Sequence, residues 1–173
     1  MNTLELFKKI TTLVFDVDGV LTDGSLLILP GDVYARRMNI KDGYALQLAV
    51  KQGYHVVIIS GADSPEVIER LNKLGITAVY TKVKDKVSVL QDYLSEHDLT
   101  WDEVMYMGDD IPDFEVMQKV ALPCCPADAV TEIKQLCKYI SPVSGGTGCA
   151  RDIIEKVMKV NGHWNQDTEI RSK

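Results

Sequence analysis

The chain has 173 residues, of which 19 are lysine or arginine and 25 are aspartate or glutamate, so its formal charge is −6. With 46% hydrophobic and 25% charged residues, it has the composition of a soluble globular domain with one core. An acidic chain with a pI near 5.0 lacks the basic surface that nucleic acids and anionic membranes require. We therefore expect neither as a partner.

Neither a targeting signal nor a membrane span is evident in the sequence. The first ten residues have no apolar stretch behind a basic start, and apolar runs such as LLIL are far shorter than the roughly 18 residues of a membrane span. We expect a cytoplasmic protein. Without repeats or linkers, the sequence predicts a single domain over residues 1–164 and a flexible polar tail over 165–173.

Short apolar runs, rich in β-branched residues, alternate with helical patterns along the chain. Such runs indicate strands that are buried on both faces. Strands are predicted at 11–17, 54–60, 78–80, 104–107, 120–123 and 138–140. Helices are predicted at 43–52, between the caps Asp63 or Ser64 and Gly75, and at 84–96, 111–119, 128–137 and 149–160.

This alternation predicts an α/β fold with a doubly wound, mostly parallel sheet and helices on both faces. One segment interrupts the alternation. Residues 25–39 contain two short strand patterns around Pro30, Gly31 and Asp32, which predicts a β-hairpin after the first strand.

Polar, mostly acidic residues follow the predicted strands at their carboxyl ends, where open α/β sheets bind ligands. Asp16 and Asp18 follow the first strand, Ser60 the second and Asp109 the fourth, while Lys86 lies near the start of the helix after the third. Several carboxylates in one crevice repel one another unless a cation binds them. Oxygen ligands with open coordination positions fit Mg²⁺, which also binds substrate phosphate. The sequence therefore predicts a magnesium site.

Four segments, in this order, resemble the four motifs of the haloacid dehalogenase superfamily of phosphotransferases. They are FDVDGVLTDG (15–24), IISGA (58–62), KDKV (84–87), in which Lys86 is the motif lysine, and MGDDIPD (107–113). Three further segments, at 39–49, 70–80 and 144–152, resemble a small capless subgroup. That subgroup includes phosphatases of 3-deoxy-D-manno-octulosonate 8-phosphate, a precursor in lipopolysaccharide synthesis. The resemblance implies hydrolysis of this or a related keto-sugar-acid phosphate.

The resemblance also implies catalytic roles. Asp16 is expected to form an aspartyl-phosphate, and Asp18 to protonate the leaving oxygen and then deprotonate water. Ser60 is expected to bind the transferring phosphoryl oxygens, and Lys86 to neutralise charge on the phosphate and the nucleophile. Members that keep a long-lived phosphoaspartate carry threonine at the position of Asp18, so this aspartate predicts hydrolysis.

The same resemblance implies how the metal and substrate are held. Mg²⁺ is expected on Asp109, the Asp16 carboxylate and the Asp18 backbone carbonyl, with Asp110 and Asp113 positioning Lys86 and metal-bound water. The residues implied in substrate contacts are Asn39, Ile40, Lys41, Asp42, Gly43, Gly61 and Arg70.

No insertion long enough for a cap domain separates the motifs. The capless subgroup covers its crevice by forming a homotetramer, in which hairpins assemble into a central barrel and each C-terminal segment reaches a neighbouring site. The apolar LLIL of the predicted hairpin supports an assembly independently, because an exposed apolar strand edge needs cover.

The sequence departs from close relatives at Ala62 and Thr147, where arginines are expected. Neighbouring cations, namely Arg36, Arg37, Lys41 or Arg151, could hold the substrate carboxylate instead. A nine-carbon keto-sugar-acid 9-phosphate is the leading alternative substrate. A non-catalytic oligomerising module of the same fold is a further alternative, which the intact catalytic residues disfavour.

Overall fold

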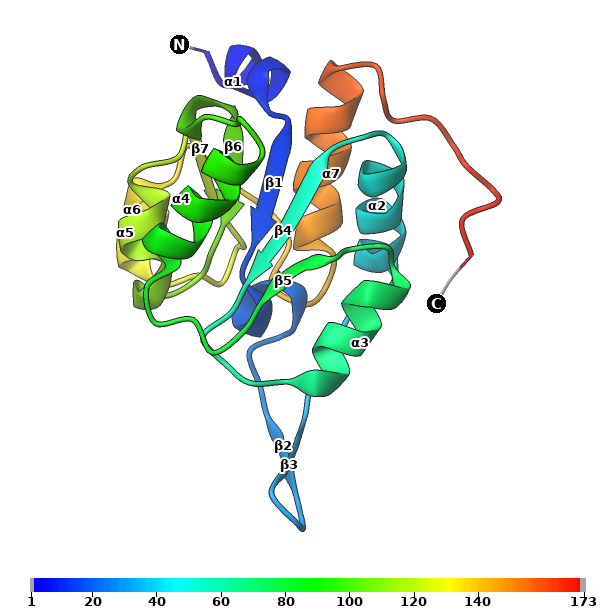
Figure 1. Ribbon diagram of the computed structural model, residues 1–173, viewed down its shortest axis with the longest axis vertical. Helices are drawn as coiled ribbons and strands as arrows, with labels where there is room; N and C mark the ends of the chain where they lie inside the picture. Colours follow the sequence, from blue (N-terminus) through cyan, green and yellow to red (C-terminus); the bar gives the residue numbers. More distant parts are fainter. Residues whose placement is uncertain (1, 172–173) are drawn as a thin grey trace.

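The computed structural model describes residues 2–171, which form a six-stranded parallel sheet with helices on both faces (Figure 1). The strand order is β5-β4-β1-β6-β7-β8. The strands are β1 (Thr12–Phe15), β4 (His55–Ile59), β5 (Ala78–Tyr80), β6 (Val104–Met107), β7 (Leu122–Cys125) and β8 (Tyr139–Ile140). The predicted fold class is confirmed.

The central strands are buried on both faces, which is why their sequences are continuous apolar runs. Every residue of β1, β6 and β7 is buried. In β1, Leu13 and Phe15 belong to one core cluster and Val14 to the other, because successive side chains point to opposite faces of the sheet. Two hydrophobic cores therefore sandwich the sheet.

The helices divide between these two cores. One core contains side chains of α1 (Thr3–Lys9), α2 (Ile40–Lys51), α3 (Pro65–Lys73) and α7 (Cys149–Val160). The other contains side chains of α4 (Lys86–Glu96), α5 (Phe114–Met117) and α6 (Thr131–Leu136). The predicted helix at 111–119 begins as a 3₁₀ turn at Ile111–Asp113 before α5.

Helix α1 was not predicted from the sequence, although a capping box marks its start. The Asn2 side chain accepts from the Leu4 backbone N–H at 3.3 Å, and the Glu5 carboxylate accepts from the Asn2 backbone N–H at 3.2 Å. Such a box is a recognisable signal of a helix start. The helix buries Leu6 and Phe7 against the core.

The predicted hairpin is confirmed. Strands β2 (Leu27–Leu29) and β3 (Val33–Ala35) pair antiparallel in a separate two-stranded sheet that projects from the carboxyl-end edge of the main sheet (Figure 1). Its apolar side chains are exposed, Ile28 to 72%. The hairpin occupies the chain between β1 and α2, and only α3 and β5 lie between β4 and α4, so residues 2–171 contain no cap domain.

The segment after α7 lies along α2. The Asp167 backbone N–H donates to the Tyr44 hydroxyl at 3.1 Å, and the Arg151 guanidinium lies 5.5 Å from the ring centroids of both Tyr44 and Trp164. Residues 165–171 of the predicted tail thus contact their own chain, while 172 and 173 lie outside the described residues. The flexibility of this tail stays a prediction. No helix within residues 2–171 is both long and apolar enough to cross a membrane.

Candidate active site

The sequence-predicted catalytic residues meet in one crevice at the carboxyl ends of the strands. Asp16 and Asp18 follow β1, Ser60 follows β4, Asp109 lies after β6, and Lys86 is the first residue of α4. All five line a crevice of about 370 Å³, together with Gly61, Asp110 and Asp113. The parallel sheet brings these residues together because it places every strand's carboxyl end at the same edge.

A tight turn after β1 allows the acidic residues to approach one another. Gly19 has φ +86°, in the left-handed region that glycine adopts without strain. A Cβ at this position would lie 2.0 Å from Oδ2 of Asp109. Only glycine therefore fits between the turn and the Asp109 carboxylate.

Lys86 lies between two carboxylates at the base of the crevice. Its Nζ donates to Oδ1 of Asp16 at 2.8 Å and to Oδ1 of Asp113 at 2.7 Å. Burial by itself would lower the pKa of Lys86, but the two carboxylates outweigh burial and the pKa is raised. The lysine is thus held as a cation beside the predicted nucleophile.

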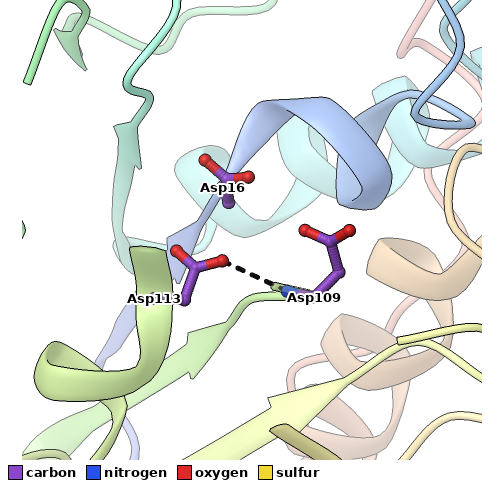
Figure 2. Close-up of side chains that lie close together, drawn as sticks. All are labelled: Asp16, Asp109 and Asp113. Atoms are coloured by element: carbon purple, nitrogen blue, oxygen red, sulfur yellow. Dashed lines mark hydrogen bonds between the residues drawn. The ribbon is translucent and has the colours of Figure 1, made fainter. Parts of the chain in front are cut away.

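The Asp113 carboxylate accepts hydrogen bonds from three groups around the crevice. Its Oδ1 accepts from the Tyr106 hydroxyl at 2.8 Å as well as from Lys86, and its Oδ2 accepts from the Asp109 backbone N–H at 3.2 Å (Figure 2). The predicted positioning of Lys86 by Asp113 has a direct geometric basis in these contacts. Asp110 accepts from the Ile111 backbone N–H at 2.8 Å and also lines the crevice.

Asp16, Asp109 and Asp113 form the kind of group that holds a metal ion. A carboxylate oxygen from each lies within 4.8 Å of the others (Figure 2). Burial, followed by repulsion from Asp113, raises the pKa of Asp16 to about 7. Burial, followed by repulsion from Asp16, raises the pKa of Asp109 to about 7. The negative charge here exceeds what Lys86 compensates, so the donor set fits a divalent cation.

Ser60 is buried and holds the turn that follows β4. Its backbone N–H donates to the Tyr80 carbonyl at 2.8 Å, and its Oγ accepts from the Ala62 backbone N–H at 3.2 Å. The loop thereby presents Gly61 and Ala62 to the crevice.

The remaining predicted substrate residues lie away from the crevice, around the start of α2. The Asn39 side chain caps this helix by accepting from the Lys41 backbone N–H at 2.8 Å. Asp42 is 2% exposed, and its Oδ1 accepts from the Arg151 backbone N–H at 2.7 Å, so its carboxylate caps the start of α7. Burial raises the pKa of Asp42 to about 6. The contact of Asp42 with Arg151 stabilises the start of α7, and its contact with substrate stays a prediction.

A second pocket of about 370 Å³ lies between the base of the hairpin and α3. Ile40 and Arg70 line this pocket, and a Cβ at Gly43 would lie 3.2 Å from Nη2 of Arg70. Glycine at position 43 therefore lets the Arg70 guanidinium rest against α2.

Two contacts to the predicted site residues were not predicted from the sequence, which named Arg36 only as an alternative partner of the substrate carboxylate. The Tyr106 hydroxyl reaches Asp113, and a tyrosine in a strand buried on both faces was a usable signal, since its hydroxyl needs a partner. Arg36 contacts Asp18, with 2.6 Å between Nε and Oδ1 and 3.3 Å between Nη2 and Oδ2. No spacing in the sequence indicated this second contact.

Comparison with known proteins places the chain in a family. Residues 75–153 match the family described as haloacid dehalogenase-like hydrolase. The 3-deoxy-D-manno-octulosonate 8-phosphate phosphatase KdsC of Escherichia coli K12 is 32% identical over 159 residues, which cover 92% of this chain and 85% of KdsC. This chain belongs to the haloacid dehalogenase-like hydrolases. Within that family, the match to curated phosphatases over most of the chain identifies it as a phosphatase.

Solved structures in the haloacid dehalogenase-like family agree with the fold. The Yersinia pestis 3-deoxy-D-manno-octulosonate 8-phosphate phosphatase has a TM-score of 0.90 and 28% identity, covering 92% of this chain and 86% of that one. The corresponding Moraxella catarrhalis enzyme, solved with a magnesium ion, a phosphate ion and a KDO molecule, has a TM-score of 0.89 and 26% identity, covering 92% of both chains.

The raised pKa values of Asp16 and Asp109 predict a pH-dependent stability of the metal-free protein. A carboxyl whose pKa is about 7 when folded and near 4 when unfolded binds more protons in the folded state between these values. The free energy of unfolding in EDTA should therefore fall as the pH rises from about 4 to about 7. Asp109→Asn should reduce this fall by at least about 1 kcal/mol, as measured by urea denaturation at pH 5 and pH 7.5.

Asp92→Asn, an exposed substitution in α4, is the matched control and should leave the fall unchanged. Equal pH slopes for wild type and Asp109→Asn would contradict the assignment of this titration to the acidic cluster.

Proposed function

We propose that this protein is a Mg²⁺-dependent phosphomonoesterase that hydrolyses 3-deoxy-D-manno-octulosonate 8-phosphate through an aspartyl-phosphate on Asp16. The observation that carries the proposal is the arrangement of Asp16, Lys86 and Asp109 in one crevice, with the lysine bound directly to the nucleophile's carboxylate. The names of the relatives support the choice of substrate, as does the KDO molecule bound in the Moraxella catarrhalis enzyme.

In the proposed first step, one Asp16 oxygen attacks phosphorus and the bond from phosphorus to the sugar oxygen breaks. Asp18 gives a proton to that oxygen, so the sugar leaves as an alcohol. In the second step, Asp18 takes a proton from water as the water oxygen attacks the phosphorus, which releases phosphate and restores the Asp16 carboxylate. Asp18 is suited to both transfers because it lines the crevice beside Asp16.

The other residues of the crevice stabilise charge during both steps. Lys86, fixed by Asp16 and Asp113, can neutralise the phosphoryl oxygens without having to reorganise. Ser60 lines the same crevice, and its hydroxyl can donate a hydrogen bond to a phosphoryl oxygen. Mg²⁺ bound by the Asp16 and Asp109 carboxylates and the Asp18 carbonyl would supply the remaining compensation of negative charge.

We place the sugar acid in the second pocket, between the hairpin base and α3. Arg70 lines it and can pair with a carboxylate, while the buried Ser64 Oγ, which lines it too, has no hydrogen-bond partner among residues 2–171. Ala62 and Thr147 lack the guanidinium groups expected in close relatives. This departure keeps a nine-carbon keto-sugar-acid 9-phosphate as a second candidate substrate.

The exposed hairpin supports a homotetramer. Leu27, Ile28 and Val33 present large apolar side chains to solvent, which is unfavourable unless another surface covers them. A C-terminal segment that reaches a neighbouring site, as predicted from the sequence, would have to exchange its contacts with Tyr44 for contacts with another subunit. The cytoplasmic location and the role in lipopolysaccharide precursor synthesis stay predictions.

The nucleophile assignment predicts a large loss of turnover in Asp16→Asn. The amide cannot attack phosphorus, so phosphate release should fall at least about a thousandfold. EDTA should abolish the wild-type activity and Mg²⁺ should restore it. Asp92→Asn serves as the control and should keep full turnover. Near-normal turnover by Asp16→Asn would refute the mechanism.

The substrate assignment predicts that Ala62→Arg lowers the Michaelis constant for 3-deoxy-D-manno-octulosonate 8-phosphate. A charge-assisted hydrogen bond to the sugar-acid carboxylate contributes roughly 1.5–3 kcal/mol, so we expect a decrease of about tenfold or more with little change in turnover. Ala62→Gln, which adds bulk without charge, is the control. If both substitutions leave the constant unchanged or raise it, position 62 does not face the carboxylate and the nine-carbon substrate becomes the better candidate.

The exposed hairpin predicts the state of assembly. Light scattering should give four times the chain mass of 19.3 kDa for the wild type and a smaller mass for Ile28→Asp, which places a charge on the apolar hairpin. Leu4→Asp alters an equally apolar exposed side chain on α1, at the opposite end of the molecule (Figure 1), and should leave the mass unchanged. A wild-type monomer with full activity would overturn this proposal.

A further inference from the structure

Arg36 reaches from the hairpin toward the crevice and binds both oxygens of Asp18, which lines it. The residue directly follows β3, yet its side chain is only 9% exposed. Its Nε donates to Oδ1 at 2.6 Å and its Nη2 donates to Oδ2 at 3.3 Å. This two-pronged contact is the geometry by which a guanidinium fixes the plane of a carboxylate.

The guanidinium is itself held in place. Nη1 of Arg36 donates to the Tyr34 backbone carbonyl at 3.3 Å, so a third nitrogen of the guanidinium is hydrogen-bonded to β3. The isolated bridge between Thr22 and Met38 closes the base of the hairpin on the segment that leaves the Asp18 turn. Arg36 and Asp18 therefore sit on two segments that are joined by backbone pairing close to both residues.

Asp18 needs such support from outside its own turn. Its side chain is 34% exposed and lies in the non-helical part of the turn after β1. A carboxylate at an open crevice can rotate, whereas a general acid or base must stay within hydrogen-bonding reach of the proton it transfers. Each Asp18 oxygen accepts one guanidinium N–H, and its other lone pair remains available for that transfer.

The neighbouring arginine shows that this placement is specific to position 36. Arg37 is 85% exposed and pairs with Asp23, outside the crevice. The two arginines lie on the same segment and carry the same charge, but only Arg36 touches a catalytic group.

We propose that Arg36 is a positioning residue that holds the Asp18 carboxylate in the orientation required for proton transfer to the leaving oxygen. This inference rests on the proposed phosphatase mechanism and adds to it a residue outside the four motifs. It also makes the hairpin part of the catalytic machinery, because the hairpin carries the group that orients Asp18.

The dependence of the rate on the leaving group separates positioning from a general structural effect. A sugar alkoxide is a poor leaving group and must be protonated as its bond to phosphorus breaks, whereas p-nitrophenolate leaves with little assistance. The ratio kcat/KM reports only the steps up to alcohol or phenol release, so the later attack of water does not contribute. Loss of a correctly oriented Asp18 should therefore harm the sugar phosphate selectively.

The test compares 3-deoxy-D-manno-octulosonate 8-phosphate with p-nitrophenyl phosphate for wild type, Arg36→Gln, Arg36→Lys and Arg37→Gln, each with saturating Mg²⁺. We expect both Arg36 variants to lose at least about tenfold in kcat/KM for the sugar phosphate and less than about threefold for the aryl phosphate. Arg36→Lys keeps the positive charge but cannot bind both Asp18 oxygens as a planar guanidinium does. If Arg36→Gln fails to fold, the comparison of Arg36→Lys with the wild type is the test. Arg37→Gln should resemble the wild type with both phosphates.

Equal losses with the two phosphates, no loss, or full activity of Arg36→Lys would overturn the proposal, since the guanidinium would then not act by orienting the proton donor. These outcomes leave the wild-type activity intact. Failure of the wild type to hydrolyse either phosphate would instead refute the proposed function, and with it the reaction that Arg36 serves.

Discussion

The site depends on one buried interaction, the ammonium group of Lys86 held between the carboxylates of Asp16 and Asp113. Burying three charged groups is unfavourable unless they pair and their remaining hydrogen-bonding capacity is used. Tyr106 and the Asp109 backbone use that capacity at Asp113. Lys86 compensates only part of the negative charge of Asp16, Asp109 and Asp113. A divalent cation bound by these carboxylates would compensate the rest.

The close approach of the acidic residues depends on glycines in two loops. Gly19 admits the Asp109 carboxylate, and a Cβ at Gly145 would lie 1.9 Å from the Gly19 carbonyl oxygen. The Gly145 backbone N–H also donates to Asp128 at 2.8 Å, which ties the loop before α7 to the segment after β7. The turn that carries Asp16 and Asp18 is therefore enclosed by backbone on more than one side, which limits its freedom to relax.

The hairpin links the crevice to the exposed apolar surface. Its strands expose Leu27 and Ile28, and the residue after its second strand reaches Asp18 through Arg36. Any partner that covers the apolar strands would therefore contact the same element that carries the arginine bound to Asp18. The exposed apolar strands and the crevice are thus linked through a few residues of continuous chain, in a protein that has no cap domain within residues 2–171.

The sequence by itself determined the sheet, the hairpin and the order of the proposed catalytic residues. Buried parallel strands need continuous apolar runs, and a parallel sheet brings residues that follow its strands to one edge. Contacts between distant segments were decided only by the tertiary structure. Asp42 caps α7 through the Arg151 backbone N–H, 109 residues later in the chain, and Arg36 binds Asp18 across 18 residues. Neither contact follows a helical or strand period, because each depends on how two separately formed elements pack against each other.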